Sequence, residues 1–341
     1  QNLDGKVNFK ANLAGSIENF KGQLELEASN INYEQLQLKG LLGSFAIDNQ
    51  GIRVTEFRAS LEGNELSVTG TIPWPKEIEL KNLLNNKQNG KELPLKLSVR
   101  SPKSNLSSLN GLIKGVTFNK GQLKVNVDVS GSWQKPEFNG YITLADASLN
   151  PASYPDAITD LKGEIIFSGN MAEINNVSAK IDQGSAKLGG IINLEPSNSN
   201  LSITYTLTKI PYKTELVKTV ITGRGQITGT LNQPLISGHI ELEDTDVNLA
   251  AYEGKPVQSY AKLPVKLDLN VDHKGDFRVR GLGLNAKGTG FVQITGSLAN
   301  LGLDGRVEAK EGSINYLDNI FEITKAQLVF QRYRGIMPLI S

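Results

Sequence analysis

The sequence predicts an all-β protein, built as a long antiparallel sheet that bends strongly along its length. Three observations indicate this fold class. Apolar and polar residues alternate with period two along most of the chain, Asn or Asp next to Gly separates the alternating segments, and helical patterns are few. The 341 residues include 34 Gly, and glycine inside strands permits bulges and sharp bends. With 39% hydrophobic residues, the chain is too apolar to be disordered.

The clearest alternation runs from Gln122 to Val129, where every second residue is apolar. Successive side chains of a strand point to opposite faces of the sheet, so each such segment has one apolar and one polar face. The predicted apolar faces are those of Leu95, Leu97 and Val99, of Leu123, Val125, Val127 and Val129, of Leu201, Ile203, Tyr205 and Leu207, and of Val265, Leu267, Leu269 and Val271.

Turns are predicted where Asn or Asp stands near Gly between apolar runs, a pattern typical of hairpins. The four stretches with this pattern are IDNQGIRV (47–54), FNKGQLKV (118–125), KIDQGSAKL (180–188) and VDHKGDFRV (271–279). Apolar residues at helical spacing predict one or two turns of helix within 104–114 and again within 213–221.

One phrase recurs, with two glycines before an alternating segment. Its copies are GSIENFKG (15–22), GSWQKPEFNG (131–140), GTLNQPLISG (229–238) and GSLANLGLDG (296–305). The glycines are nine apart in three copies and seven apart in the first. A difference of two residues keeps the two faces in phase, whereas a difference of one would invert them. The gaps between copies are unequal, which predicts a loose array of hairpins rather than a strict repeat.

Gly281, Gly283 and Ala286 match the pattern G-x-G-x-x-[G/A] of a dinucleotide-binding loop. That loop must open a helix, whose N-terminus binds the pyrophosphate. Here Gly288 and Gly290 are followed by the β-branched run up to Thr295, which favours a strand. These glycines, together with Gly296, are therefore predicted to lie in or beside curved strands.

Composition argues against an enzyme and against nucleic acid as a partner. The 36 basic and 35 acidic residues are spread along the chain, without a basic stripe. Cysteine is absent, and His239 and His273 are the only histidines, each read as a solvated strand or turn residue. Asp244 and Asp246 lack the glycine and closing Glu of a calcium loop. No catalytic residue, metal site or cofactor is predicted.

Trp74 and Trp133 stand near prolines where strands meet loops and are read as packing residues. No apolar run approaches the roughly 20 residues of a membrane span.

The apolar face allows two architectures. One is a closed sandwich, in which two sheets pack about 10 Å apart over a dry core; the other is an open trough. The pattern by itself favours the sandwich. The monotonous alternation and the aliphatic Leu, Ile and Val side chains suit an open surface for acyl chains.

The C-terminal third resembles TamB-like proteins. Residues 229–249 match the step G-T-L-x-x-P-x-x-x-G-x-I-x-L, and residues 278–298 match the GL-x-A-x-G-x-G strand pair that follows it. The ending matches at Gly312, Ile314, Tyr316, Phe321, Ile323, Ala326, Leu328 and Phe330. The resemblance is specific over 225–330 and looser over 15–207.

This resemblance implies one elongated bent sheet over 1–341, called a β-taco, as a segment of a longer protein of the AsmA-like, bridge-like lipid transfer superfamily. Its concave face would be an apolar groove for phospholipid acyl chains. It also implies an N-terminal anchor in the inner membrane, absent from this chain, and an Omp85-type β-barrel as outer-membrane partner. The expected location is the periplasm, with a plastid envelope as the alternative.

The leading hypothesis is thus a non-enzymatic conduit for phospholipid between the two membranes of a diderm envelope. The predicted lining of the groove is Leu24, Leu26, Leu95, Leu97, Val99, Leu123, Val125, Val127, Val129, Ile203, Tyr205, Leu207, Val265, Leu267, Leu269, Val271, Leu328 and Phe330. A second hypothesis is a chaperone-like translocation and assembly module that guides outer-membrane β-proteins by pairing strands at a sheet edge. A third is a structural β-rich surface protein.

Overall fold

The computed structural model describes residues 3–16, 19–33, 36–61, 64–74, 94–111, 113, 115–152, 154–196, 198–251, 264–297, 300–317, 319–335 and 339–340. The chain divides into two compact units. Unit 1 comprises 1–152, 160–175 and 193–198, and unit 2 comprises 153–159, 176–192 and 199–341.

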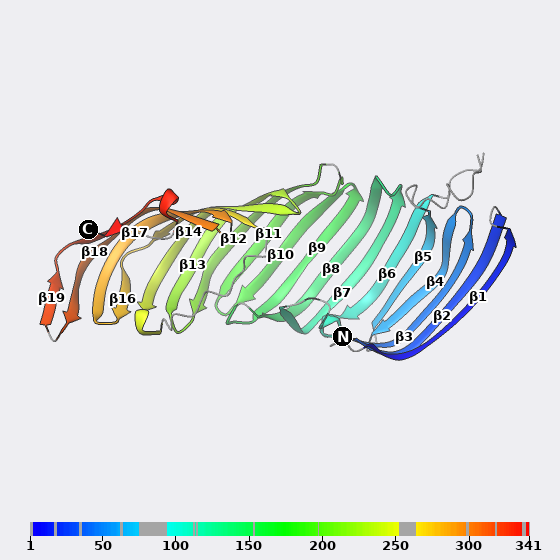
Figure 1. Ribbon diagram of the computed structural model, residues 1–341, viewed down its shortest axis with the longest axis horizontal. Helices are drawn as coiled ribbons and strands as arrows, with labels where there is room; N and C mark the ends of the chain where they lie inside the picture. The colour runs from blue at the N-terminus through cyan, green and yellow to red at the C-terminus, as the bar shows by residue number, and fades with distance from the viewer. Residues whose placement is uncertain are drawn as a thin grey trace. The chain divides into compact units, whose positions relative to one another are not determined.

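Unit 1 is an antiparallel sheet in which each strand from β1 to β8 pairs with the next in chain order. Figure 1 shows these strands side by side, with β1 to β5 visibly curved. The strands are β1 (Leu3–Ser16), β2 (Asn19–Tyr33), β3 (Leu36–Asp48), β4 (Gly51–Leu61), β5 (Asn64–Pro73), β6 (Leu95–Asn105), β7 (Val116–Gly131), β8 (Pro136–Pro151) and most of β9 (Ile158–Gly169). A short 3₁₀ helix, η1 (Leu106–Leu109), follows β6.

Unit 2 is also built mainly from β-strands. β10 (Met171–Ile181) contributes residues to both units. The other strands are β11 (Gly184–Asn193), β12 (Asn200–Lys213), β13 (Val217–Thr230), β14 (Gln233–Asn248), β15 (Lys266–His273), β16 (Phe277–Gly281), β17 (Leu284–Ser297), β18 (Asn300–Tyr316), β19 (Asn319–Ile323), β20 (Ala326–Phe330) and β21 (Leu339–Ile340). The short helices are η2 (Leu249–Ala251) and η3 (Arg332–Arg334). The predicted all-β, bent-sheet fold class is confirmed.

In both units, β-bulges bend the strands at several strand pairs. The register shifts once between β3 and β4 and again between β4 and β5, twice between β7 and β8, and once in each pair from β12 to β14. Asn30, Asp146 and Asp244 have φ of about 50° in bulges of β2, β8 and β14. Asn and Asp tolerate this left-handed conformation better than most residues, and a bulge bends its strand.

One expectation about pairing was wrong, because not every pair is antiparallel. Residues 235–242 of β14 pair in parallel with β15, and residues 246–248 pair in parallel with β16. A parallel neighbour requires the chain to return to the start of the preceding strand, which takes a dozen or more residues. The stretch 249–265, which contains Pro256 and Pro264 and little alternation, has the necessary length.

Two of the four predicted hairpin turns are confirmed. The Asp48 carboxylate accepts hydrogen bonds from the amides of Gln50 (2.9 Å) and Gly51 (3.2 Å), which closes the turn between β3 and β4. Asp182 and Gln183 separate β10 from β11.

The other two predicted turns lie within continuous pairing. The FNKG stretch is inside β7, where Gly121 accompanies two register shifts. The stretch at 274–276 only interrupts a strand, because β15 and β16 both pair with β14 on one side and β17 on the other. Asn or Asp near Gly thus marks bulges and breaks as well as turns.

The predicted helix at 104–114 is confirmed as η1, whose N-cap Asn105 accepts from the Ser107 amide. The helix predicted at 213–221 is wrong. There β13 begins at Val217, and the β-branched residues Val217, Thr219, Val220 and Ile221 explain why a strand wins over helical spacing.

All four copies of the repeated phrase are hairpins, formed by β1–β2, β7–β8, β13–β14 and β17–β18. Their first glycines, Gly15, Gly131, Gly229 and Gly296, have φ between 86° and 107° at the end of the first strand. The loop residues 17, 18, 298 and 299 lie outside the described residues. The repeated sequence therefore specifies the end of one strand, a hairpin turn, and a second strand whose apolar residues face the same side as those of the first.

Replacing Gly140 tests this conformational constraint. Gly140 has φ of 128°, and a Cβ there would collide with the Asn126 carbonyl of the neighbouring strand. We expect Gly140→Ala to lower the free energy of unfolding by about 2 kcal/mol or more, measured by urea denaturation.

Gly40→Ala is the matched control, since no atom lies within 4 Å of its Cβ position. It should change the free energy of unfolding by no more than about 1 kcal/mol. Equal effects of the two substitutions would contradict the proposed role of Gly140.

Candidate functional site: a continuous apolar face

Strand register joins the apolar side chains of unit 1 into continuous rows that cross the sheet. Each row consists of residues that pair directly from one strand to the next. The first row is Phe9, Leu26, Gly43, Phe57, Val68, Val99, Val127 and Gly140. The second row is Ala11, Leu24, Phe45, Val54, Gly70, Leu97, Val129 and Phe138. The Phe138 ring also contacts Phe167 of β9, with 6.2 Å between centroids.

These rows bring together the predicted residues of unit 1. Leu24, Leu26, Leu97, Val99, Val127 and Val129 lie in the two rows. On the same face, Val125 and Leu123 lie opposite Ser101 and Ser104, and Leu95 lies opposite Gly131. Sequence reasoning missed Phe45, Phe57, Val68 and Phe138, although Val68 and Phe138 are also apolar residues in alternating segments.

Unit 2 carries three rows of the same kind. They are Ile203, Ile227, Ile236, Leu267, Gly296 and Leu301; Tyr205, Gly225, Gly238, Leu269, Ile294 and Leu303; and Leu207, Gly223, Ile240, Val271, Val292, Gly305 and Phe330. Leu328 is two residues from Phe330 on β20 and therefore shares its face. Val265 lies just before the first residue of β15 and is half-buried.

Burial on this face is incomplete. Leu95, Val127, Ile203 and Tyr205 are buried, and the other predicted lining residues are half-buried. No large side chain among the described residues is fully buried. The core of a closed sandwich would contain such side chains, so this burial pattern favours a face that is open along much of its length.

The opposite face is polar and solvated. Lys10 and Glu25 pair across β1 and β2 at 3.6 Å, and Arg100 pairs with Asp128 across β6 and β7 at 2.6 Å. Hydrogen bonds from Ser98 and then Arg100 hold the pKa of Asp128 below its usual range. Exposed ion pairs of this kind contribute little to stability. Their charges favour solvent on this face, so the apolar residues gather on the opposite face.

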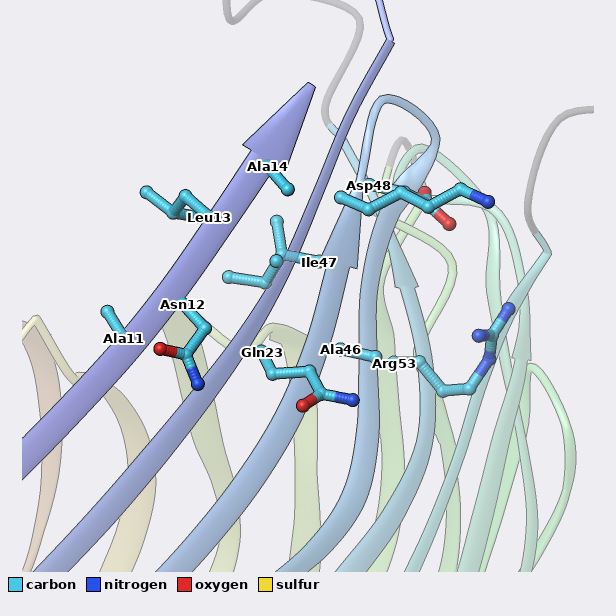
Figure 2. A pocket seen from close by; sticks show the side chains of 11 residues that line it. Ala11, Asn12, Leu13, Ala14, Gln23, Ala46, Ile47, Asp48 and Arg53 are labelled. Atoms are coloured by element: carbon cyan, nitrogen blue, oxygen red, sulfur yellow. The ribbon is translucent and has the colours of Figure 1, made fainter. Parts of the chain in front are cut away.

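A cavity of about 660 Å³ lies at the ends of β1 to β4, near their hairpin turns. Figure 2 shows Asn12 and Gln23 on one side of their strands and Ala11 and Leu13 on the other side of β1. Arg53, Asp48 and Lys21 add charged groups to its lining. The cavity is lined by polar and apolar residues from both faces of the sheet, and it meets the second row at Ala11.

Tyr205 illustrates how glycines shape the apolar face. Its hydroxyl donates to the Ser237 carbonyl at 3.2 Å, and its oxygen lies 2.5 Å from the Cβ position of Gly225 and 2.7 Å from that of Gly238. The ring therefore occupies space that any side chain at those two positions would fill. Burial raises the pKa of Tyr205.

The two histidines and the carboxylates of Asp244 and Asp246 have structural surroundings. His239 faces Asp272 at 3.5 Å on exposed strand surface, and the His273 ring packs edge-on against Phe277. Asp246 pairs with Arg280 at 3.0 Å, while Asp244 occupies its bulge. The described part of the chain contains no cluster of His, Asp or Glu that could hold a metal ion.

Both tryptophans use their indole N–H in packing. Trp74 donates to the Asp48 carbonyl at 2.9 Å, and Trp133 donates to the Pro73 carbonyl at 2.9 Å.

Residues 173–340 match the family model of the TamB C-terminal domain. This chain is a TamB-like protein. The match begins upstream of Gly225, where the recognisable sequence pattern starts, and includes β12 to β20 with their three apolar rows. No curated protein and no solved structure matches the chain.

TamB-like proteins are transport and assembly components of the cell envelope rather than enzymes. In this TamB-like chain, the described helices are all too short to span a membrane.

Tyr205→Phe tests the packing of the apolar face. The change removes the hydrogen bond to Ser237, so we expect the free energy of unfolding to fall by about 1 kcal/mol at neutral pH. The raised pKa means that the phenol ionises first in the unfolded state. The parent should therefore lose stability as pH rises above about 10, and the variant should lack this part of the loss.

Tyr333→Phe is the control, because Tyr333 is exposed. Urea denaturation at neutral and alkaline pH measures both effects. A Tyr205→Phe protein with the stability and pH slope of the parent would show that this ring is not held as described.

Proposed function

We propose that this TamB-like chain is a conduit along which phospholipid acyl chains move on the apolar face, between the inner and outer membranes of a diderm envelope. The rows defined above form the path, and the lining residues predicted from the sequence are part of it. The observation that carries the proposal is the continuity of the rows. In each unit every apolar residue of a row meets an apolar residue or glycine of the next strand.

The driving force is removal of acyl surface from water, at about 0.8 kcal/mol per CH₂ group. A face of Leu, Ile, Val and Phe side chains supplies this contact without donors or acceptors that would hold a lipid at one point. Glycines such as Gly70 and Gly238 add no side chain to the rows, and Gly70 lies beside the bulge in β4. Binding is therefore spread over the face, and a lipid can shift from row to row at small cost.

The position of the lipid headgroups follows from the division of the sheet into one apolar and one polar face. Acyl chains lie on the apolar face while headgroups remain in water at its open side. The expected location is the periplasm. The expected partners are phospholipids, an Omp85-type barrel in the outer membrane, and the inner membrane through an anchor outside this chain.

A translocation and assembly module for outer-membrane β-proteins is the second candidate. One observation favours it: β19 hydrogen-bonds to β18 on one side, and no described strand pairs with its other edge. Such an edge can accept a strand from another protein. This candidate requires backbone pairing at the edge and makes no use of the apolar rows.

Leu269→Arg is the direct test of the conduit. Leu269 lies between Gly238 and Ile294 and is only half-buried, so the guanidinium of a longer side chain at this position can reach water. The protein should stay folded, with a melting temperature within a few degrees of the parent. A charge on the path should lower the phospholipid that co-purifies with the protein about tenfold or more, measured by mass spectrometry.

Asn270→Arg is the matched control, one residue further along β15 on the opposite face. It should leave the bound phospholipid unchanged. Equal lipid content in both variants, or no lipid in the parent, would contradict the conduit and leave the assembly module as the better explanation.

A further inference from the structure

The short helix η1 of unit 1 is held at both ends by asparagine side chains. At its start, the Asn64 side-chain amide donates to the Asn105 carbonyl at 2.9 Å, and the Asn64 side-chain oxygen accepts from the Asn105 amide at 2.7 Å. Just after its end, the Asn110 side chain makes the same two bonds with the backbone of Phe118, at 2.9 and 2.7 Å. We call these two arrangements the asparagine clamps.

The clamps fix a segment that belongs to no strand. Each side-chain amide offers one donor and one acceptor, so it pairs with the backbone as a neighbouring strand would. Asn64 is buried and also donates to the Ser108 hydroxyl inside η1. Because an unpaired buried amide is costly, residues 106–110 are held firmly in one position.

η1 presents an apolar side chain to the apolar face of unit 1. Ser104 lies opposite Leu123 on that face, and Leu106 follows two residues later, after an extended Asn105. Leu106 therefore points to the same side of the sheet. It is 4% exposed, and its Cδ1 lies 2.7 Å from the Cβ position of Gly121, so a side chain at Gly121 would displace it.

η1 also bridges a curved section of the sheet. Its Cα atoms lie within 8 Å of those of β3 as well as those of β6 and β7. In the order of the strands, β4, β5 and β6 stand between β3 and β7. η1 therefore crosses the strand ends at this rim, where β3 begins and β6 ends.

The apolar face is well covered next to η1. On β2, β4 and β6, the residues on this face that follow the first row toward η1 are small, namely Ala28, Ala59 and Ser101. Each is at most 6% exposed, whereas the larger Phe57 and Val99 of the first row are only half-buried. The apolar face of unit 1 thus becomes more enclosed toward the rim that η1 crosses.

We propose that residues 106–110 form a wall that closes this rim and keeps acyl chains from leaving the apolar face there. The inference rests on the proposed conduit and adds what retains its cargo at one side. Acyl surface that slips over an unprotected rim enters water, and a wall that carries Leu106 prevents this contact. Asn64 and Asn110 are positioning residues, because they act on lipid through η1.

Thiol labelling tests the wall, because the chain contains no cysteine. Ser104→Cys places a thiol beside η1, and Val54→Cys places one at a buried position near the β3–β4 turn, at the other end of the strands. Asn110→Asp keeps the side-chain shape but replaces the donor with an oxygen that faces the Phe118 carbonyl. With a water-soluble maleimide, this change should accelerate labelling of the Ser104→Cys protein about tenfold or more and leave the Val54→Cys protein unchanged.

Release of lipid is the second readout. The chain is loaded with phosphatidylethanolamine that carries a fluorophore on one acyl chain, and transfer to phosphatidylcholine vesicles is followed. Asn110→Asp should raise the release rate several-fold, and Asn64→Asp should do the same because it breaks the other clamp. Asn150→Asp is the matched control, since Asn150 is exposed and its amide donates to the exposed Asn119 side chain at 3.3 Å. It should change neither rate.

Three results would overturn the inference. Unchanged labelling of the Ser104→Cys protein in both clamp variants would mean that the clamps do not hold η1 over this face. Equal acceleration of the Val54→Cys protein would mean general unfolding rather than a separate wall. Faster labelling with an unchanged release rate would mean that this rim does not retain lipid.

Failure of the conduit gives a different result. A parent that takes up no phospholipid contradicts the conduit and, with it, the retention of lipid. Thiol labelling in that case still decides whether η1 closes this rim of the apolar face.

Discussion

Phase is the constraint on which the structure depends, because an apolar face exists only while each strand alternates in step with its neighbours. A slip of one residue would turn a whole strand over. The repeated hairpins preserve phase: Gly15 and Gly22 are seven residues apart, Gly131 and Gly140 nine, and both spacings keep the alternation. Where a bulge shifts the register, the sequence shifts with it. Val54 and Phe57, three residues apart, lie on one face on either side of the bulge in β4.

The proposed function follows from the same constraint. Rows held in register give a continuous apolar surface, whereas the cavity at β1 to β4 is lined by residues of both faces. A pocket selects one ligand and holds it, whereas a continuous aliphatic surface contacts any acyl chain and releases it to the next row. In the proposed conduit, the bulges and glycines that bend the strands therefore shape the lipid path as well as the fold.

Much of this was predictable from the sequence because period-two alternation is a local property. The segments around Val127 and Leu269 each identify a strand and the face it buries, and the recurring Gly phrase identifies hairpins. The parallel pairing of β14 was not predictable, since it depends on which distant strand the chain returns to. The pattern of Asn or Asp near Gly misled at 118–121 and 274–276, because bulges and turns use the same residues. Phe45 and Phe57 were missed on the apolar face because bulges interrupt the alternation around them.

The measurement that tests the central claim most directly is a photo-crosslinking scan along β7, with a photoreactive residue placed in turn at each position from Gln122 to Val129 in protein that contains phospholipid. The account predicts lipid adducts with period two. Adducts should form at Leu123, Val125, Val127 and Val129, and not at Gln122, Lys124, Asn126 or Asp128. Adducts at both sets of positions, or at neither, would contradict the claim that acyl chains lie on the apolar face.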